Sequence, residues 1–157
     1  MPRITKFSRP CTYSVPGFLG ALDSSFVAAI DDTTWLCSTN NTYECPTSLG
    51  GTVAKSNAYT VTAKVGLASE MEIFGSYGGT ADGSAVFDLF NGATADDRKK
   101  YQPGTSTARL WWLRSPHWNV AYYERSVSSS GTASGSFAYN SSGVVPAVKI
   151  SKTVVSE

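Results

Sequence analysis

The sequence predicts a loop-rich α+β domain, in which short helices precede a small, twisted, mostly antiparallel sheet with β-hairpins in the C-terminal third. Three observations support this fold class. Charged residues form only 16% of the 157-residue chain, against about a quarter in an average globular protein. Helix-capping signals occur in the first half of the chain. From residue 109 onward, side chains alternate with the period of two that is typical of strands.

The domain is expected to span residues 17–157, a length at which a single domain can bury a sizeable core. Residues 1–16 contain Pro2, Pro10 and Pro16, and proline interrupts both helices and strands. We therefore expect an extended N-terminal arm ahead of the domain.

The first helix, or a pair of turns, is expected over residues 18–30. Asp23 is a suitable N-cap, because its carboxylate can accept a hydrogen bond from a free amide of the first turn. Phe26 and Ile30 then lie on one helical face. The aspartates at 31–32 are expected to end the helix.

Two strands and a capped helix are expected next. Residues 33–37 form an apolar run around a tryptophan, and residues 59–67 alternate in polarity, with a Ser-, Thr- and Asn-rich loop between them. The pattern Ser69-x-x-Glu72 is a capping box, which predicts one or two helical turns through Phe74. A further short apolar turn or helix is expected over residues 86–90, followed by a brief polar segment.

The C-terminal third is expected to consist of four strands. The first has apolar residues on both faces, which favours a central position in the sheet. Gly131 and the segment 140–143 provide hairpin turns. Pro146 cannot donate to a strand ladder and indicates an edge strand or a bulge. The strands are expected over residues 109–115, 122–127, 134–139 and 144–150.

The first of these strands is expected to anchor the core through Trp111 and Trp112, since tryptophan buries a large apolar area. Arg114 lies in the same apolar strand and needs partners, because an unpaired buried charge is costly. A structural ion pair or hydrogen bonds to loop carbonyls would satisfy it. The candidate acids are Glu72, Asp88 and Asp97.

The sequence does not indicate a catalytic or metal site. His117 is the only histidine, and neither a CxxC pair nor a suitably spaced acid accompanies it as a zinc ligand. Nucleophilic catalysis would need an acid that orients the imidazole and a nucleophile beside it, and Ser115 and Glu124 are close only in sequence. We therefore expect no metal, no cofactor and no enzymatic activity.

A recognition surface is expected between residues 117 and 142, where Tyr, Trp, Ser, Gly and Asn are plentiful. Tyr and Trp provide contact area at a low entropic cost, while Ser, Gly and Asn adapt their hydrogen bonds. The alternative is a pair of ordinary hairpins whose Ser and Asn side chains satisfy turns. The candidate ligand-binding residues are Trp118, Asn119, Tyr122, Tyr123, Tyr139 and Asn140.

Charge and hydropathy argue against nucleic-acid and membrane partners. The net charge of +1 provides no basic surface for polyanions. The sequence contains no apolar run of the roughly twenty residues that a spanning helix needs, and the polar start predicts no secretory signal. Cys11, Cys37 and Cys45 are expected to be buried free thiols, with a Cys37–Cys45 bridge as the alternative.

Several motifs occur in a characteristic order, and their residues are Lys6-Phe7-x-Arg9-Pro10, Trp112-Leu113-Arg114-Ser115-Pro116, Val127-x-x-x-Gly131 and Gly143-Val144-x-Pro146-Ala147. This order resembles a domain family of unknown function from phages, prophages and gut bacteria. Members look like distant relatives of C-type lectins and formylglycine-generating enzymes. The resemblance implies a C-type-lectin-like α+β scaffold that displays loops. The residues expected to anchor it are Trp111, Trp112, Arg114, Pro116, Gly143 and Pro146.

The chemistry of those relatives is not expected here. Calcium-dependent sugar binding uses several hard oxygen ligands, and the segment 102–104 lacks the acid of the lectin motif, as does the segment 118–120. The copper-binding cysteine pair of the oxidases has no counterpart, since no cysteine follows Cys45.

Two functions remain for such a chain. The first is a non-enzymatic recognition module of a phage or prophage particle (a tail-fibre, receptor-binding or capsid-surface component) that binds a bacterial surface glycan or protein. The alternative is a structural virion decoration or assembly subunit without a cell ligand, whose aromatic residues contact other virion subunits. In both cases we expect a homo-oligomer at the virion surface. For the recognition module, many copies would compensate for a modest affinity at each site.

Overall fold

The computed structural model describes residues 16–41, 45–46, 52–54, 56–76, 78–79, 82–83 and 85–151. Within them, short helices and small antiparallel sheets are joined by loops, which is the α+β arrangement that the sequence predicts. The expected N-terminal arm lies outside the described residues, apart from its last residue, with which the first helix begins.

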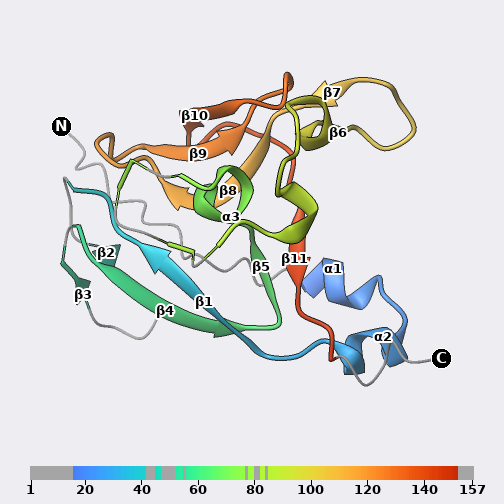
Figure 1. Cartoon of the computed structure of the whole chain (residues 1–157). Coiled ribbons are helices and arrows are strands. Elements are labelled where there is room, and N and C mark those ends of the chain that lie inside the picture. Colours follow the sequence, from blue (N-terminus) through green and yellow to red (C-terminus); the bar gives the residue numbers. More distant parts are fainter. Residues whose placement is uncertain are drawn as a thin grey trace, which may run out of the picture.

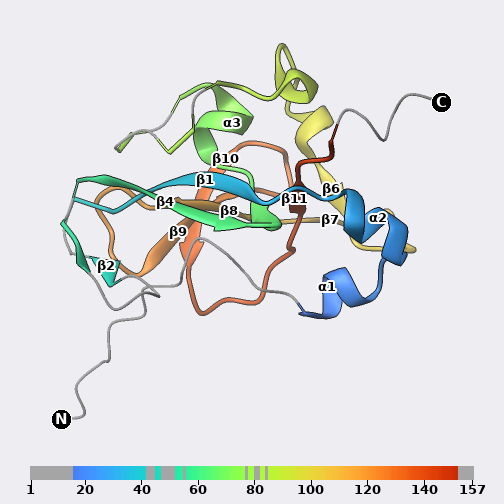
Figure 2. The same ribbon diagram turned by 90° about the horizontal axis from the view of Figure 1, so that it is seen from below.

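Two short helices, α1 (Pro16–Gly20) and α2 (Ser24–Ala29), lie together at one end of the molecule (Figures 1 and 2). The helix or pair of turns expected over residues 18–30 is therefore present as two short helices with a turn between them. Gly20 disfavours helix continuation by about 1 kcal/mol. Asp23 then caps α2 as predicted, because its carboxylate accepts a hydrogen bond from the Ser25 amide at 2.8 Å.

The strand expected over residues 59–67 is divided between two sheets. Its first part, β4 (Ala58–Ala63), pairs antiparallel with β1 (Thr33–Ser38). Its last part, β5 (Val65–Leu67), pairs antiparallel with β11 (Pro146–Val148). A separate small ladder joins β2 (Cys45–Pro46) to β3 (Thr52–Val53).

The predicted capping box opens α3 (Glu70–Phe74). The Ser69 hydroxyl accepts a hydrogen bond from the Glu72 amide at 3.1 Å, and the Glu72 carboxylate accepts one from the Ser69 amide at 2.9 Å. The helix ends at Phe74 and is capped by Gly75, whose φ of 74° places it in the left-handed region that glycine adopts readily.

Short elements connect α3 to the C-terminal third. The 3₁₀ helix η1 (Asp88–Phe90) lies inside the predicted segment 86–90. A second 3₁₀ helix, η2 (Asp96–Arg98), precedes the ladder of β6 (Lys100–Tyr101) and β7 (Ala108–Arg109).

A three-stranded antiparallel sheet follows, in the order β10 (Ala133–Phe137), β9 (Tyr123–Val127), β8 (Trp111–Pro116). The central strand of this sheet is β9, not β8 as expected. The other edge of β8 is nevertheless covered, because its amides donate to the carbonyls of Ala68 and Gly143 at 2.9 and 3.0 Å.

The first of the two predicted hairpins is confirmed and the second is wrong. Strands β9 and β10 pair directly, and Gly131 lies in their turn with a φ of 81°. Residues 140–143 do not form a hairpin, since β11 pairs with β5 rather than with β10. Within the described residues β5 is the only strand paired with β11, which agrees with the edge position predicted from Pro146.

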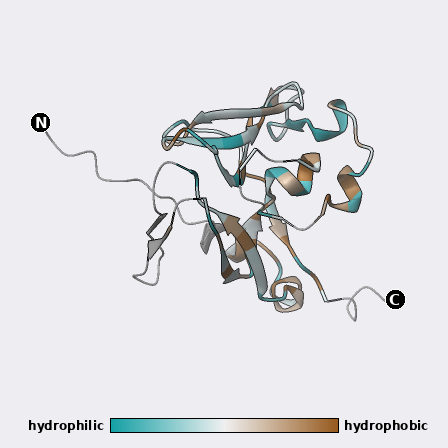
Figure 3. Ribbon diagram, turned by 60° about the vertical axis from the view of Figure 1, so that its left-hand side comes forward, coloured by the Kyte–Doolittle hydropathy of each residue, from teal (hydrophilic) through white to brown (hydrophobic). Residues whose placement is uncertain are grey.

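The main core lies between β8 and α3, and a second cluster lies around Trp35 and Cys37 on β1. The Cys37 thiol is fully buried, as expected. In Figure 3 much of the β9–β10 hairpin is pale or teal, which marks residues of intermediate or hydrophilic character. The core cluster consists of Ala68, Ile73, Phe90, Trp111, Leu113 and Val127.

A candidate recognition surface beside a buried anchor

Arg114 is the polar centre of the scaffold. Its guanidinium forms a bidentate ion pair with the Glu72 carboxylate, with both N–O distances at 2.6 Å. It also donates to the backbone carbonyls of Leu36, Leu67 and Asp82, at 2.8, 2.7 and 2.6 Å. Arg114 on β8 thereby ties together β1, β5, α3 and the loop that contains Asp82.

Both partners that the sequence predicts for Arg114, an acid and loop carbonyls, are present. Of the three candidate acids, Glu72 is the partner. Asp88 is exposed in η1, and the Asp97 carboxylate instead accepts hydrogen bonds from the amide and hydroxyl of Thr94, both at 2.7 Å.

The other predicted anchor residues also belong to the scaffold. Trp111 and Trp112 are buried. Gly143 pairs with the backbone at the beginning of β8. Its amide donates to the Leu110 carbonyl at 2.8 Å, and its carbonyl accepts a hydrogen bond from the Trp112 amide. Pro116 and Pro146 lie in β8 and β11.

A second ion pair, which the sequence did not indicate, links α3 to β9. Glu70 pairs with Arg125, whose Nε donates to the carboxylate at 2.6 Å. The Glu70 amide donates to the Ser115 hydroxyl at 2.7 Å. Glu70 and Glu72 therefore bind arginines on two neighbouring strands.

Asp82 is a buried acid without a cation of its own. Neither carboxyl oxygen makes a well-formed hydrogen bond within the described residues. Burial raises the pKa of Asp82 above its ordinary value of 3.8, against the opposing effects of the Ser115 hydroxyl and the Arg114 guanidinium.

Four of the six predicted ligand-binding residues belong to a continuous aromatic cluster at the open end of β9 and β10. We call this cluster the aromatic surface. Trp118, Tyr122 and Tyr139 are 40%, 61% and 75% exposed, whereas Tyr123 is half-buried. The members of the aromatic surface are His117, Trp118, Tyr122, Tyr123, Phe137 and Tyr139.

Ring contacts hold the aromatic surface together. The Phe137 ring stacks between Tyr122 and Tyr139, at centroid distances of 5.7 and 4.9 Å. Tyr123 faces Phe137 across the ladder and meets its ring edge to face at 4.6 Å. The His117 ring meets Tyr123 at 5.8 Å and stacks on Trp118 at 6.3 Å. The two exposed tyrosines thus rest on a ring that is itself fixed in the sheet.

Phe137 was missed by the sequence prediction of this surface. The strand predicted over residues 134–139 contained the signal, because Phe137 and Tyr139 are two residues apart and would share one side of such a strand. The predicted Asn119 and Asn140 are exposed beside the rings. Asn140 donates from its side chain to the Ser136 hydroxyl at 2.9 Å.

His117 is half-buried and contacts the rings of Trp118 and Tyr123. Burial and the positive charge of Arg125 lower the pKa of His117. Its backbone amide donates to the Tyr123 carbonyl at 3.0 Å. Within the described part of the chain, no group of three or more His, Cys, Asp and Glu side chains is placed to hold a metal ion.

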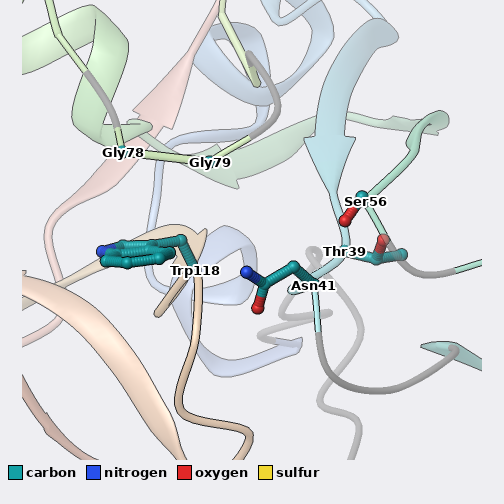
Figure 4. Close-up of a pocket in the computed structure, with 6 residues that line it drawn as sticks. All are labelled: Thr39, Asn41, Ser56, Gly78, Gly79 and Trp118. Carbon is teal, nitrogen blue, oxygen red and sulfur yellow. The ribbon is translucent and has the colours of Figure 1, made fainter.

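One end of the aromatic surface borders a pocket of about 270 Å³ (Figure 4). Trp118 forms one side, and segments far away in the sequence form the others. No local sequence pattern indicates that those segments meet, because only the fold brings them together. The described residues that line the pocket are Thr39, Asn41, Ser56, Gly78, Gly79 and Trp118.

Comparison with known proteins places the chain in a family. No helix among the described residues is long and apolar enough to cross a membrane. No curated protein and no solved structure matches the chain, so its likeness to C-type lectins stays a prediction. A family model described as a domain of unknown function (DUF6273) matches residues 6–152, and the chain therefore belongs to that family.

Proposed function

We propose that the protein is a non-enzymatic recognition module that binds a bacterial surface glycan through the aromatic surface. The observation that carries this proposal is the exposure of Tyr122 and Tyr139 on either side of Phe137. Exposed aromatic side chains that are already held in place lose little entropy on binding. Their faces also suit the C–H faces of sugar rings.

Several features favour a glycan over a charged partner. Among the residues of the aromatic surface only His117 is titratable near neutral pH, and its lowered pKa favours the neutral imidazole. The cation nearest in sequence to the residues of the aromatic surface is Arg125, and its side chain is paired with Glu70. The display of the module on a phage or prophage particle is the setting that the sequence motifs imply, and repeated copies there would raise the avidity.

The proposal is tested by binding a fluorescent, multimerised protein to a panel of gut bacteria in a flow cytometer. We expect binding to some strains, and a loss of at least about tenfold in the double variant Tyr122→Ala/Tyr139→Ala. Tyr101→Ala is the matched control, because Tyr101 is 55% exposed on β6, outside the aromatic surface. Absence of binding to every strain, or equal binding by the double variant, would overturn the proposal.

A structural virion subunit without a cell ligand is the second candidate. It is favoured by apolar side chains that are exposed away from the aromatic surface, namely Phe26, Phe87 and Leu89, the last of which is 77% exposed. Neighbouring subunits would cover them. Sedimentation at low micromolar concentration together with the cell-binding assay distinguishes the two, since this alternative requires self-association that Leu89→Ser weakens and no binding to any bacterial strain.

A further inference from the structure

We infer that the pocket beside Trp118 binds a single ring of an uncharged sugar, which rests on the proposed glycan recognition and assigns one subsite to it. The pocket volume of about 270 Å³ lies just below the range of about 300–1,000 Å³ for sites of drug-sized ligands. A pocket of this size accommodates one ring at the end of a glycan. The rest of the glycan would then run over the aromatic surface.

The residues that line the pocket match the chemistry of a neutral sugar. The six described lining residues are uncharged and provide an indole, a primary amide and the exposed hydroxyl of Ser56, whereas the hydroxyl of Thr39 is buried and bonded to the backbone. A pyranose presents a C–H face that packs on an indole, and hydroxyls that both donate and accept hydrogen bonds. Amide and hydroxyl side chains also do both. A phosphate or carboxylate ligand would call for an arginine or lysine, and none is among the described lining residues.

The walls of the pocket are fixed by backbone hydrogen bonds between distant segments. The Asn41 amide donates to the Trp118 carbonyl, and the Ser56 amide donates to the Asn40 carbonyl, both at 2.9 Å. The Thr39 hydroxyl donates to the Ala54 carbonyl at 2.8 Å and so shapes the wall. The side chains of Asn41 and Ser56 are exposed at the rim.

The backbone at Ser56 supports a functional role. Its φ of 55° makes Ser56 the one residue other than glycine with a positive φ in the described part of the chain. This conformation costs on the order of 1–3 kcal/mol, and such residues gather at ligand-binding sites. The strain places a hydroxyl at the rim that a glycine in this position would lack.

Gly78 sets the position of the indole. A Cβ at this residue would lie 2.9 Å from Cδ1 of Trp118, so the glycine backbone packs directly against the ring. Figure 4 shows Gly78 and Gly79 above the indole, with Asn41 beside it. Trp118 is therefore held in place before any ligand arrives, although 40% of it stays exposed.

Trp118 also provides a specific readout. Of the four tryptophans of the chain, Trp35, Trp111 and Trp112 are buried. Iodide, which reaches only exposed indoles, should therefore quench the fluorescence of Trp118 selectively. Protection from iodide by a bound sugar reports on binding at Trp118, and the pocket variants Asn41→Ala and Ser56→Gly then show whether the sugar lies in the pocket.

The experiment titrates the full chain with separate neutral monosaccharides (glucose, galactose, mannose, rhamnose and their N-acetylhexosamine counterparts) and with N-acetylneuraminic acid as a charged sugar. We expect at least one neutral sugar to protect Trp118 with a Kd in the millimolar range. Asn41→Ala should weaken that binding about tenfold, and Ser56→Gly, which also relieves the backbone, should weaken it severalfold. Asn91→Ala is the control, an exposed amide outside the pocket.

Two results would overturn the inference. One is that no neutral sugar protects Trp118, and the other is that Asn41→Ala and Ser56→Gly bind the sugar like the wild type. The cell-binding assay tests the proposed function independently of the sugar titration, which tests the pocket. If bacteria bind the wild type and lose Tyr122→Ala/Tyr139→Ala, while no sugar protects Trp118, recognition stands and the pocket assignment falls.

Discussion

Strand β8 and the β9–β10 hairpin belong to the same sheet but have opposite surroundings. Residues 111–115 of β8 are all buried, and the guanidinium N–H groups of Arg114 donate their hydrogen bonds to groups inside the molecule. The hairpin instead presents rings at its open end, with Tyr122 and Tyr139 mostly exposed. The contrast indicates that stability resides in β8 and its partners, and that the rings are available for binding.

The largest expected effect is on stability and comes from a substitution in the buried strand β8. Arg114→Met should lower the free energy of unfolding by about 3–5 kcal/mol, because Glu72 is left as an uncompensated buried charge. Urea denaturation measures the change. Arg109→Met is the control, since Arg109 is exposed and bonds only the Gln102 side chain, and its cost should stay near 0.5 kcal/mol. Equal stability of the two variants would contradict the role given to Arg114.

The second prediction concerns the turn that closes the hairpin. An alanine Cβ at Gly131 would lie 1.7 Å from the Ala95 carbonyl oxygen, whereas one at Gly92, which has a similar positive φ, meets nothing within 4 Å. Gly92→Ala should therefore cost about 1 kcal/mol for backbone strain alone. Gly131→Ala should cost about 2–4 kcal/mol, because steric overlap is added. Thermal unfolding of both variants would refute this packing if their melting temperatures agree.

A third prediction uses the pH dependence of stability. The pKa of Asp82 is raised by burial, so between pH 3.8 and the folded pKa the folded state keeps a proton that the unfolded state has lost. The contribution of Asp82 to stability is thus present at low pH and is lost as the pH rises through the folded pKa. Asp82→Asn should remove this loss and be more stable than the wild type at neutral pH. Urea unfolding from pH 4 to 8 checks the difference, and a wild type that gains on the variant with rising pH would contradict it.

The smallest expected effect comes from His117 and has the opposite sign. Its pKa is lowered from 6.5, so the unfolded state takes up a proton first as the pH falls. The contribution of His117 is present above pH 6.5 and is lost as the pH drops through the folded pKa. His117→Gln should flatten this decline in melting temperature. A steeper decline in the variant would show that the imidazole is protonated in the folded protein.

Local signals in the sequence predicted most of the elements, and distant contacts decided the rest. The Asp23 cap and the Ser69–Glu72 capping box depend on neighbouring residues, and both are confirmed. The pairing of β5 with β11 joins segments about eighty residues apart, and no local pattern specifies it. Periodicity likewise could not show that β9 rather than β8 is the central strand.

The residues of the candidate site were also predicted only in part from the sequence. Tyr122 and Tyr139 were identified from composition, because exposed tyrosine in a Ser- and Asn-rich hairpin is typical of recognition surfaces. The pocket residues Asn41 and Ser56 were not identified, since their role depends on the meeting of two loops with Trp118. Side-chain chemistry is visible in the sequence, whereas the arrangement of loops is set by the whole fold.

The most direct test of the separation between scaffold and surface measures stability and cell binding on one preparation of Tyr122→Ala/Tyr139→Ala. We predict a loss of at most about 1–2 kcal/mol in the free energy of unfolding, since both side chains are mostly exposed. Binding to a strain that the wild type recognises should fall at least about tenfold. The account would be contradicted by unchanged binding, or by a loss of binding that merely follows the loss of folded protein.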